Sequence, residues 1–278
     1  MQERKLKGYS GCTVTVGNVD TDEPYVLKIS PGVFYNNRLF KQKEKQETYQ
    51  SKRGEIKTPR IINDGYLESR YFFKMDYVIG GVTLYEYVDF NPLHKSRSVL
   101  EVMIDDCLSK DDFLCKCSGD VFKKKIIDQK NMCLNMRRSK EVFDILENFD
   151  FSEIPNTNCH GDLTLENVLI SKDGIYYIDF LDSFYDSWMM DIAKILQDLE
   201  LLWSGRFSSI STEAKLKFLF LADYTRERIM QLSDGSRKLD MVYKLLLLNL
   251  TRIYPYIKDD LTLMWLNNSI NYLLDKEN

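Results

Sequence analysis

TNCHGDLTLENVLISKDGIYYIDFLDS, residues 157–183, places His160, Asp162, Asn167 and Asp179 beside two short apolar segments. The KDG between those segments is typical of a β-hairpin, because Asp and Gly accept the backbone conformations that a tight turn needs. A hairpin folds the chain back on itself. We therefore expect Asn167 and Asp179 to lie close together although they are distant in sequence.

These residue types suit phosphoryl transfer from a nucleotide. That reaction needs a carboxylate to orient or deprotonate the acceptor hydroxyl, oxygen ligands for Mg²⁺, and a cation for the phosphates. Asp162, Asn167 and Asp179 supply the first two groups. A single Asp or Asn in a loop more often caps a helix or forms a turn. The complete set at this spacing favours catalysis.

The segment resembles the aminoglycoside phosphotransferase and choline kinase family of small-molecule kinases. The resemblance rests on His160-x-Asp162-x4-Asn167, followed after the hairpin by Ile178–Asp179–Phe180. Protein kinases usually carry an arginine after the histidine. The resemblance implies an α+β, bilobal protein-kinase-like fold, with a small antiparallel β-sheet and one helix in the N-terminal lobe and a larger, mainly helical C-terminal lobe.

Apolar patterning agrees with two lobes. Strand-like segments and one charged helix at 36–50 occupy residues 1–76, the expected nucleotide-binding lobe. Residues 77–278, the expected catalytic and acceptor-binding lobe, become almost wholly helical after Met190, with apolar residues at three- and four-residue spacing. Residues 97–149 also read as helical and charged, but nothing in them indicates a role.

The resemblance implies a role for each residue of the motif. Asp162 would be the catalytic base, and Asn167 and Asp179 would hold the metal. Asp191, in MMDIAK, would brace the catalytic loop from the next helix. His160 is expected to pack and to hold the loop rather than to act as a base.

A kinase of this type also needs a lysine on the third strand and a glutamate on the following helix. Lys28 lies within the apolar strand YVLKIS, where a cation is otherwise unexpected. The family's spacing favours Glu44 as its ion-pair partner, and Glu47, one turn further, stays open.

The nucleotide-binding segments carry weaker signals. GYSGCTVTVGN lacks the GxGxxG spacing of protein kinases, and we place a phosphate-covering hairpin at Ser10 and Gly11. The segment FFKMDYVIGG resembles the linker between the lobes. Met75, Asp76 and Val78 would form this hinge and receive the adenine, although they also read as ordinary strand residues.

The acceptor is left open by the sequence. Asp182 and Asp186 would attract an amine such as an aminoglycoside or choline, and Trp203 could join an aromatic cage for a quaternary ammonium. Arg206 instead suits a sugar hydroxyl, a carboxylate or a phosphate. The short stretch from Asp179 to the next helix leaves no room for the long activation segment of protein kinases, which disfavours a protein substrate.

Composition excludes several other classes. The formal net charge of −4 gives no basic footprint for nucleic acid. The apolar runs are too short for a membrane span, and the N-terminus lacks the apolar core of a signal peptide, so we expect no membrane association and a cytoplasmic location. The six cysteines form no CxxC pair, which indicates free thiols.

The sequence therefore predicts a kinase that uses ATP and Mg²⁺ to phosphorylate a hydroxyl of a small molecule, such as a sugar, an aminoglycoside or an amino alcohol. A protein kinase and a catalytically silent nucleotide-binding scaffold are the alternatives. ATP versus GTP as donor and the oligomeric state stay open.

Overall fold

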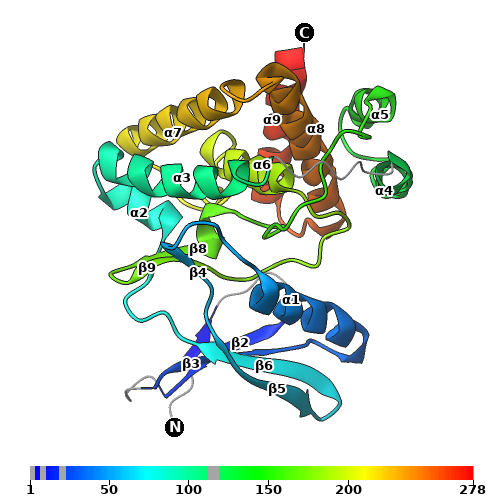
Figure 1. Ribbon diagram of the computed structural model, residues 1–278. Helices are drawn as coiled ribbons and strands as arrows, with labels where there is room; N and C mark the ends of the chain where they lie inside the picture. Colours follow the sequence, from blue (N-terminus) through cyan, green and yellow to red (C-terminus); the bar gives the residue numbers. More distant parts are fainter. Residues whose placement is uncertain (1–3, 7–10, 19–22, 112–118, 278) are drawn as a thin grey trace.

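The smaller lobe is built on one antiparallel sheet. The computed structural model describes residues 4–6, 11–18, 23–111 and 119–277. Within them, five strands pair in the order β1-β2-β3-β6-β5, and every pairing is antiparallel. The strands are β1 (Arg4–Leu6), β2 (Thr13–Gly17), β3 (Tyr25–Ile29), β5 (Ile61–Leu67) and β6 (Arg70–Asp76). The helix α1 (Asn36–Thr48) packs against this sheet (Figure 1).

Alternation along the strands builds the core of this lobe. In β6 every second residue is buried, and Tyr71, Phe73 and Met75 pack with Leu39 of α1. Lys28 takes the same alternation in β3 and is only 3% exposed. Lys28 is therefore a buried cation at a position of the strand where an apolar residue is expected.

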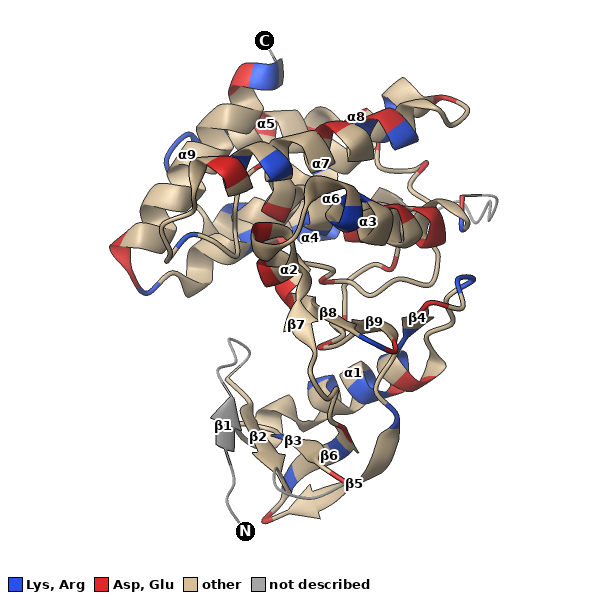
Figure 2. Ribbon diagram, turned by 90° about the vertical axis from the view of Figure 1, so that its left-hand side faces the viewer, with Lys and Arg blue, Asp and Glu red and all other residues tan. Residues whose placement is uncertain are grey.

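A second, smaller sheet lies between the first sheet and the helices (Figure 2). Its order is β4-β9-β8-β7, from β4 (Ile56–Lys57), β7 (Val82–Thr83), β8 (Val168–Ser171) and β9 (Gly174–Tyr177). β8 and β9 form the predicted hairpin, and β4 pairs with β9 in parallel. Gly174 is required here, because a Cβ would lie 2.8 Å from the Glu55 carbonyl oxygen.

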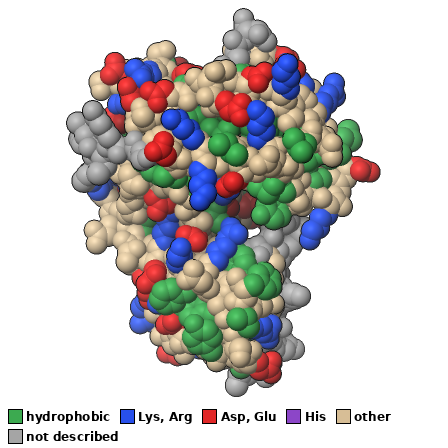
Figure 3. Space-filling model, turned by 90° about the vertical axis from the view of Figure 1, so that its right-hand side faces the viewer, with side chains coloured by type: hydrophobic (Ala, Val, Ile, Leu, Met, Phe, Trp, Pro, Cys, Tyr) green, Lys and Arg blue, Asp and Glu red, His purple; other side chains and the backbone are tan. Residues whose placement is uncertain are grey.

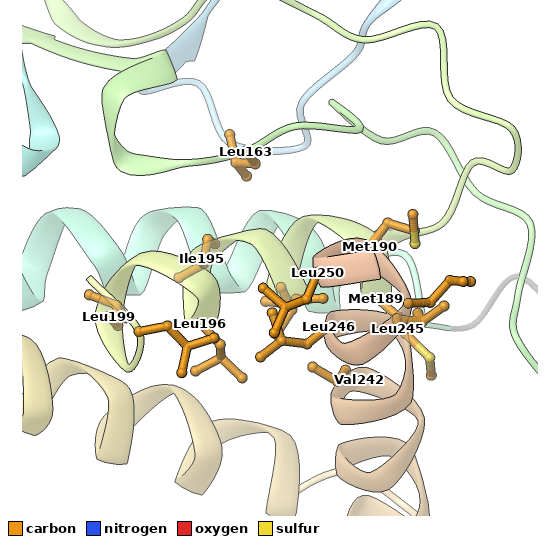
Figure 4. Close-up of a cluster of buried hydrophobic side chains, with 14 of the residues drawn as sticks. Leu163, Met189, Met190, Ile195, Leu196, Leu199, Val242, Leu245, Leu246 and Leu250 are labelled. Carbon is orange, nitrogen blue, oxygen red and sulfur yellow. The ribbon is translucent and has the colours of Figure 1, made fainter. Parts of the chain in front are cut away.

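Helices make up most of the larger lobe. They are α2 (Leu84–Phe90), α3 (Leu93–Leu108), α4 (Gly119–Met132), α5 (Ser139–Asn148), α6 (Trp188–Leu199), α7 (Thr212–Met230), α8 (Gly235–Ile253) and α9 (Asp260–Glu277). Every residue of α6 is buried. Figure 4 shows its apolar side chains packed against α8, with Leu163 lying on the other side of α6. This core fixes the floor beneath the loop that holds Asp162.

The structure confirms the α+β, bilobal fold and the antiparallel sheet with one helix. Thr83 caps α2 in a reciprocal capping box with Glu86. The strands β4, β5 and β7 were not predicted. β4 and β7 are two residues long, and β5 is mostly exposed, so none of the three carries a clear apolar pattern. In the described part of the chain, no helix is long and apolar enough to cross a membrane.

Candidate active site

The loop that carries Asp162 is pinned from below by apolar side chains and by α6. Leu163 and Leu165 are fully buried. The Leu165 N–H donates to Asp198 Oδ2 at 2.6 Å, and the Thr164 N–H donates to the Asp162 carbonyl at 2.8 Å. The loop therefore has a fixed path, with the Asp162 side chain about one-third exposed above it.

Asp191, in the first turn of α6, braces the start of this loop. Its two carboxylate oxygens accept the His160 and Gly161 N–H groups, each at 2.7 Å. Burial raises the pKa of Asp191 to about 6, against the lowering effect of nearby Lys110 and of these two bonds. Gly161 has a φ of +87°, and a Cβ there would lie 2.1 Å from Ser183 Oγ, so no larger residue fits.

The neutral form of the His160 side chain holds the loop in place. Its Nδ1 accepts the Asp162 N–H at 3.2 Å, which places the ring proton on Nε2, 2.7 Å from the Ile178 carbonyl. Burial lowers the pKa of His160 to about 4. The ring thus joins the catalytic loop to the end of the hairpin.

The hairpin brings Asn167 and Asp179 together, as expected. Asn167 Nδ2 donates to the Asp162 carbonyl at 2.7 Å, and the Asn167 carbonyl accepts the Ile178 N–H at 3.0 Å. Asp179 follows with a φ of 62°, a left-handed conformation that costs a non-glycine residue about 1 kcal/mol. The Asn167–Ile178 bond on one side and a Leu181–His160 bond on the other hold it there.

Asp162 is paired with a lysine from α6. Lys194 Nζ lies 3.1 Å from Asp162 Oδ1 and also donates to Gln197 Oε1 at 3.3 Å. Burial alone would raise the pKa of Asp162, but the charge and hydrogen bond of Lys194 outweigh it, and the pKa is lowered. The carboxylate is therefore ionised at neutral pH.

Lys28 crosses from the small lobe to Asp179. It forms an ion pair with Asp179, and its Nζ also donates to Gln42 Oε1 at 3.1 Å. Burial opposes its charge, but Asp179 outweighs burial and leaves the pKa of Lys28 raised. Asp179 stays 44% exposed, so one side of this carboxylate faces the space between the lobes.

The predicted Lys28–Glu44 ion pair is wrong, and so is the alternative through Glu47. Glu44 is exposed, and Glu47 pairs with Lys43 at 3.0 Å. The buried face of α1 consists of Leu39, Gln42, Lys43 and Gln46. Glu44 is two residues from Gln42 and hence on the far side of a helix with 3.6 residues per turn. The three- and four-residue spacing from Leu39 was the signal that could have identified Gln42.

The other nucleotide-side residues lie along the edge between the lobes. Met75 is buried in the core of the small lobe, and Asp76 pairs with Arg60 at 3.2 Å. Val78 begins a turn in which its carbonyl accepts the Gly81 N–H at 3.2 Å. Gly11 is exposed, while Ser10 lies outside the described residues.

The predicted acceptor residues do not form one group. Asp182 and Asp186 lie near Gly161. Lys45, which pairs with Asp186, and Ser183, the residue after Asp182, both approach Gly161 closely. The segment of Trp203 and Arg206 lies beside the other end of the loop, because Ser204 and Leu165 share the carboxylate of Asp198. Arg206 stacks on the Trp203 ring at 3.5 Å, next to α9. The structure thus separates the two acidic residues from the Trp–Arg pair.

Sequence reasoning missed Lys194, Asp198 and Lys45. Lys194 and Asp198 are charged residues that α6 buries among apolar side chains. Lys45, from the charged helix α1, donates to the Leu181 carbonyl at 3.0 Å and binds Asp186 at 2.6 Å. For Lys194 and Asp198, a charged residue within a strongly apolar helix was the available signal, whereas no such contrast marks Lys45.

Known proteins share both the motif region and the fold. The model of the "Phosphotransferase enzyme family" matches residues 127–229, which contain Asp162, Asn167, Asp179 and Asp191. No curated protein matches the chain in sequence.

Solved structures match almost the whole chain at low sequence identity. The complex of APH(2")-IIIa with GDP and kanamycin has a TM-score of 0.61 and 12% identity, covering 100% of this chain and 93% of that one. Amicoumacin kinase hAmiN, solved with AMP-PNP, Ca²⁺ and Ami, has a TM-score of 0.60 and 15% identity over 99% and 88%. A putative aminoglycoside phosphotransferase from Ralstonia eutropha has a TM-score of 0.58 and 12% identity, covering 99% of this chain and 90% of that one. The expected resemblance to this family of phosphotransferases is confirmed.

Proposed function

Taking the kinase-like fold and the phosphotransferase motif region as the premise, we propose that the chain transfers the γ-phosphoryl group of ATP to a hydroxyl of a small molecule. One observation carries this proposal. An unbroken series of contacts runs from Lys28 to Asp179, along the hairpin end to Asn167, and on to Asp162. The groups that phosphoryl transfer requires thus meet at one point between the lobes.

The residues at this point fit Mg²⁺. The Nδ2 of Asn167 donates to the Asp162 carbonyl, so the Oδ1 of Asn167 faces away from the loop. Asp179 offers a half-exposed carboxylate. Among the described residues, no cluster of three or more His, Cys, Asp or Glu could hold a metal without other ligands. Two protein oxygens with nucleotide phosphates and water are the donor set that Mg²⁺ usually takes. The bound ion would neutralise charge on the phosphates.

Asp162 would orient the acceptor hydroxyl and accept its proton. Its lowered pKa keeps it ionised but makes it a weak base, so the proton moves late, after bonding to phosphorus has begun. Lys194 would hold the carboxylate in place. Lys28 would bind the α- and β-phosphates, with Gln42 fixing its side chain.

The remaining assignments extend this proposal to the whole chain. Residues 1–76 would bind the nucleotide and 77–278 would supply the acid–base groups and the acceptor site, with the β4 strand as the one part of the first segment that joins the second sheet. Met75, Asp76 and Val78 would contact the adenine, and the turn at Gly11 would cover the phosphates. Asp191 and His160 would act only by holding the loop.

The test is phosphorylation of small molecules. The purified chain would be incubated with ATP and Mg²⁺ and with sugars, aminoglycosides, amino alcohols and hydroxy acids, and mass spectrometry would look for the added phosphoryl group. We expect a product that is absent with Asp162→Asn. Phosphate appearing on protein instead would support a protein kinase, and Asp179-dependent ATP binding without any product would support a silent scaffold. The same product yield from Asp162→Asn would refute the assignment of the base.

A further inference from the structure

The acidic residues near the site are already neutralised by lysines of α1. Asp186 binds Lys45 at 2.6 Å, and Asp182 lies 3.8 Å from Lys41. A carboxylate that already has a cationic partner gives little net attraction to a second cation. The expectation that Asp182 and Asp186 attract an amine therefore loses its physical basis.

Two cations instead meet on one aromatic ring in the segment that follows Asp179. Lys125 Nζ of α4 lies 5.8 Å from the Phe184 ring centroid, and the Arg252 guanidinium of α8 lies 5.5 Å from it. Phe184 itself is fixed edge-to-face on buried Phe122, with 5.3 Å between centroids. Arg252 is held by its own helix, because its Nη1 donates to Asn249 Oδ1 at 2.9 Å. The charge of Arg252 thus has a fixed position.

The charge of a third residue, Arg38 of α1, also acts on both side chains, although its guanidinium lies over the Tyr35 ring, 5.2 Å from the centroid. Burial is the main reason why the pKa values of Lys125 and Arg252 are lowered, and the charge of Arg38 lowers both further. Asp162 acts on Arg252 in the opposite sense, which places the guanidinium within the field of the catalytic carboxylate. We call Lys125 and Arg252, the two cations on the Phe184 ring, the cation cluster.

The cation cluster forms no ion pair within the described residues. Asp128, one turn along α4 from Lys125, and Asp162 each favour the charged form of one member without a salt bridge to it. Figure 3 shows Lys and Arg side chains around the hollow where the lobes meet, with Asp and Glu side chains beside them. Like charges held together repel one another, and a bound anion relieves that repulsion.

We propose that the hydroxyl acceptor of this enzyme carries an anionic group, a carboxylate or a phosphate, which Arg252 and Lys125 bind beside Phe184. This inference rests on the proposed kinase function, because it places the anion next to the base that receives the hydroxyl proton. Arg252 suits either anion through two parallel N–H donors. An acceptor of this class excludes aminoglycosides and choline, which are cations.

The experiment compares acceptors that share one hydroxyl-bearing skeleton and differ in a single substituent: carboxylate, phosphate, neutral amide or ammonium. Steady-state kinetics would be measured for the wild type, Arg252→Gln, Lys125→Gln and the matched control Lys124→Gln. Lys124 is an exposed neighbour on α4 outside the cluster. We expect turnover with the carboxylate or phosphate compound, and a KM for it that rises about tenfold in each cluster variant. The KM for ATP should not change, and Lys124→Gln should behave as the wild type.

Equal turnover of the amide or ammonium compound, or a KM that no cluster variant alters, would overturn the anionic acceptor. A rise in the KM for ATP instead would assign the cluster to the nucleotide. Binding is measured separately by calorimetry, using the same compounds on Asp162→Asn with a non-hydrolysable ATP analogue present. If no compound is phosphorylated but the anionic ones bind and Arg252→Gln abolishes that binding, the kinase proposal fails and the anion site stands. If none binds, both fail.

Discussion

The catalytic loop and the cation cluster beside it use charged side chains in opposite ways. In the loop each acid has a partner: Asp162 has Lys194, Asp179 has Lys28, and Asp191 has two backbone N–H groups. In the cluster, Lys125 and Arg252 lie on the Phe184 ring, and neither forms an ion pair with a described residue. In the loop, partners within the protein orient the charged groups, whereas the two cations of the cluster have no ion-pair partner that competes with a ligand. The position of a charge relative to its neighbours, rather than its sign in the sequence, indicates its role.

The largest effect should come from the loop. Asp162→Asn removes the proton acceptor but preserves shape, so kcat should fall by about 10²- to 10⁴-fold. Binding of an ATP analogue, measured by calorimetry, should not change, since Asp179 and Lys28 stay in place. An unchanged kcat would mean that the loop carboxylate, like its neighbours, is only structural.

Asp191→Ala in the loop and Arg252→Gln in the cluster should differ in their effect on the stability of the fold. The substitution leaves the buried His160 and Gly161 N–H groups without an acceptor, and it should lower the free energy of unfolding by about 3 kcal/mol. Arg252→Gln should leave that free energy near the wild-type value or slightly higher, because it relieves repulsion. Urea unfolding followed by circular dichroism checks both. An equal loss of unfolding free energy in the two variants would mean that Arg252, like Asp191, stabilises the fold.

His160 should make stability depend on pH. Its pKa is about 4 in the fold against 6.5 in an exposed histidine, so the unfolded chain takes up a proton first as the pH falls. The stabilisation is complete above pH 6.5 and is lost between pH 6.5 and about 4, by about 3 kcal/mol in total. His160→Gln keeps a donor for the Ile178 carbonyl and should lack this loss. Unfolding of both proteins at pH 7.5, 5.5 and 4.5 would test it, and parallel curves would contradict it.

Lys194 should have the smallest effect, on the pH profile of the reaction. Because Lys194 lowers the pKa of Asp162, Lys194→Met should move the acidic limb of kcat to higher pH by about one unit. Lys124→Gln is the control for loss of one positive charge. An acidic limb that stays in place would show that the 3.1 Å contact does not tune the base.

The motif region could be predicted from the sequence because its geometry is local. The hairpin that joins Asn167 to Asp179 has a turn signal of three residues, and the caps and periodicity of α2 and α6 are likewise local. Gln42 was missed because an acid was expected at a family spacing, whereas the buried face of α1 decides which residue reaches Lys28.

The acceptor side could not be predicted for a different reason. Lys125 and Arg252 are far apart in the sequence, and only the packing of α4 against α8 brings them together on Phe184. Their charges are ordinary in sequence, since Lys and Arg on helices are most often solvated. Asp182 and Asp186 carried the clearer local signal, but their lysine partners lie on α1, far back in the chain.

The parallel pairing of β4 with β9 has a mechanical consequence. The small lobe is joined to the large one by the linker around Gly80 and, separately, by the segment before β4, which Asp106 of α3 anchors through Ser51 Oγ at 2.6 Å and the Lys52 N–H at 2.9 Å. Two separate connections between the lobes restrict their relative motion to a rotation about the line that joins the connections. The lobes should therefore open and close by rotation about one axis, so that each closure returns Lys28 to the same position at Asp179.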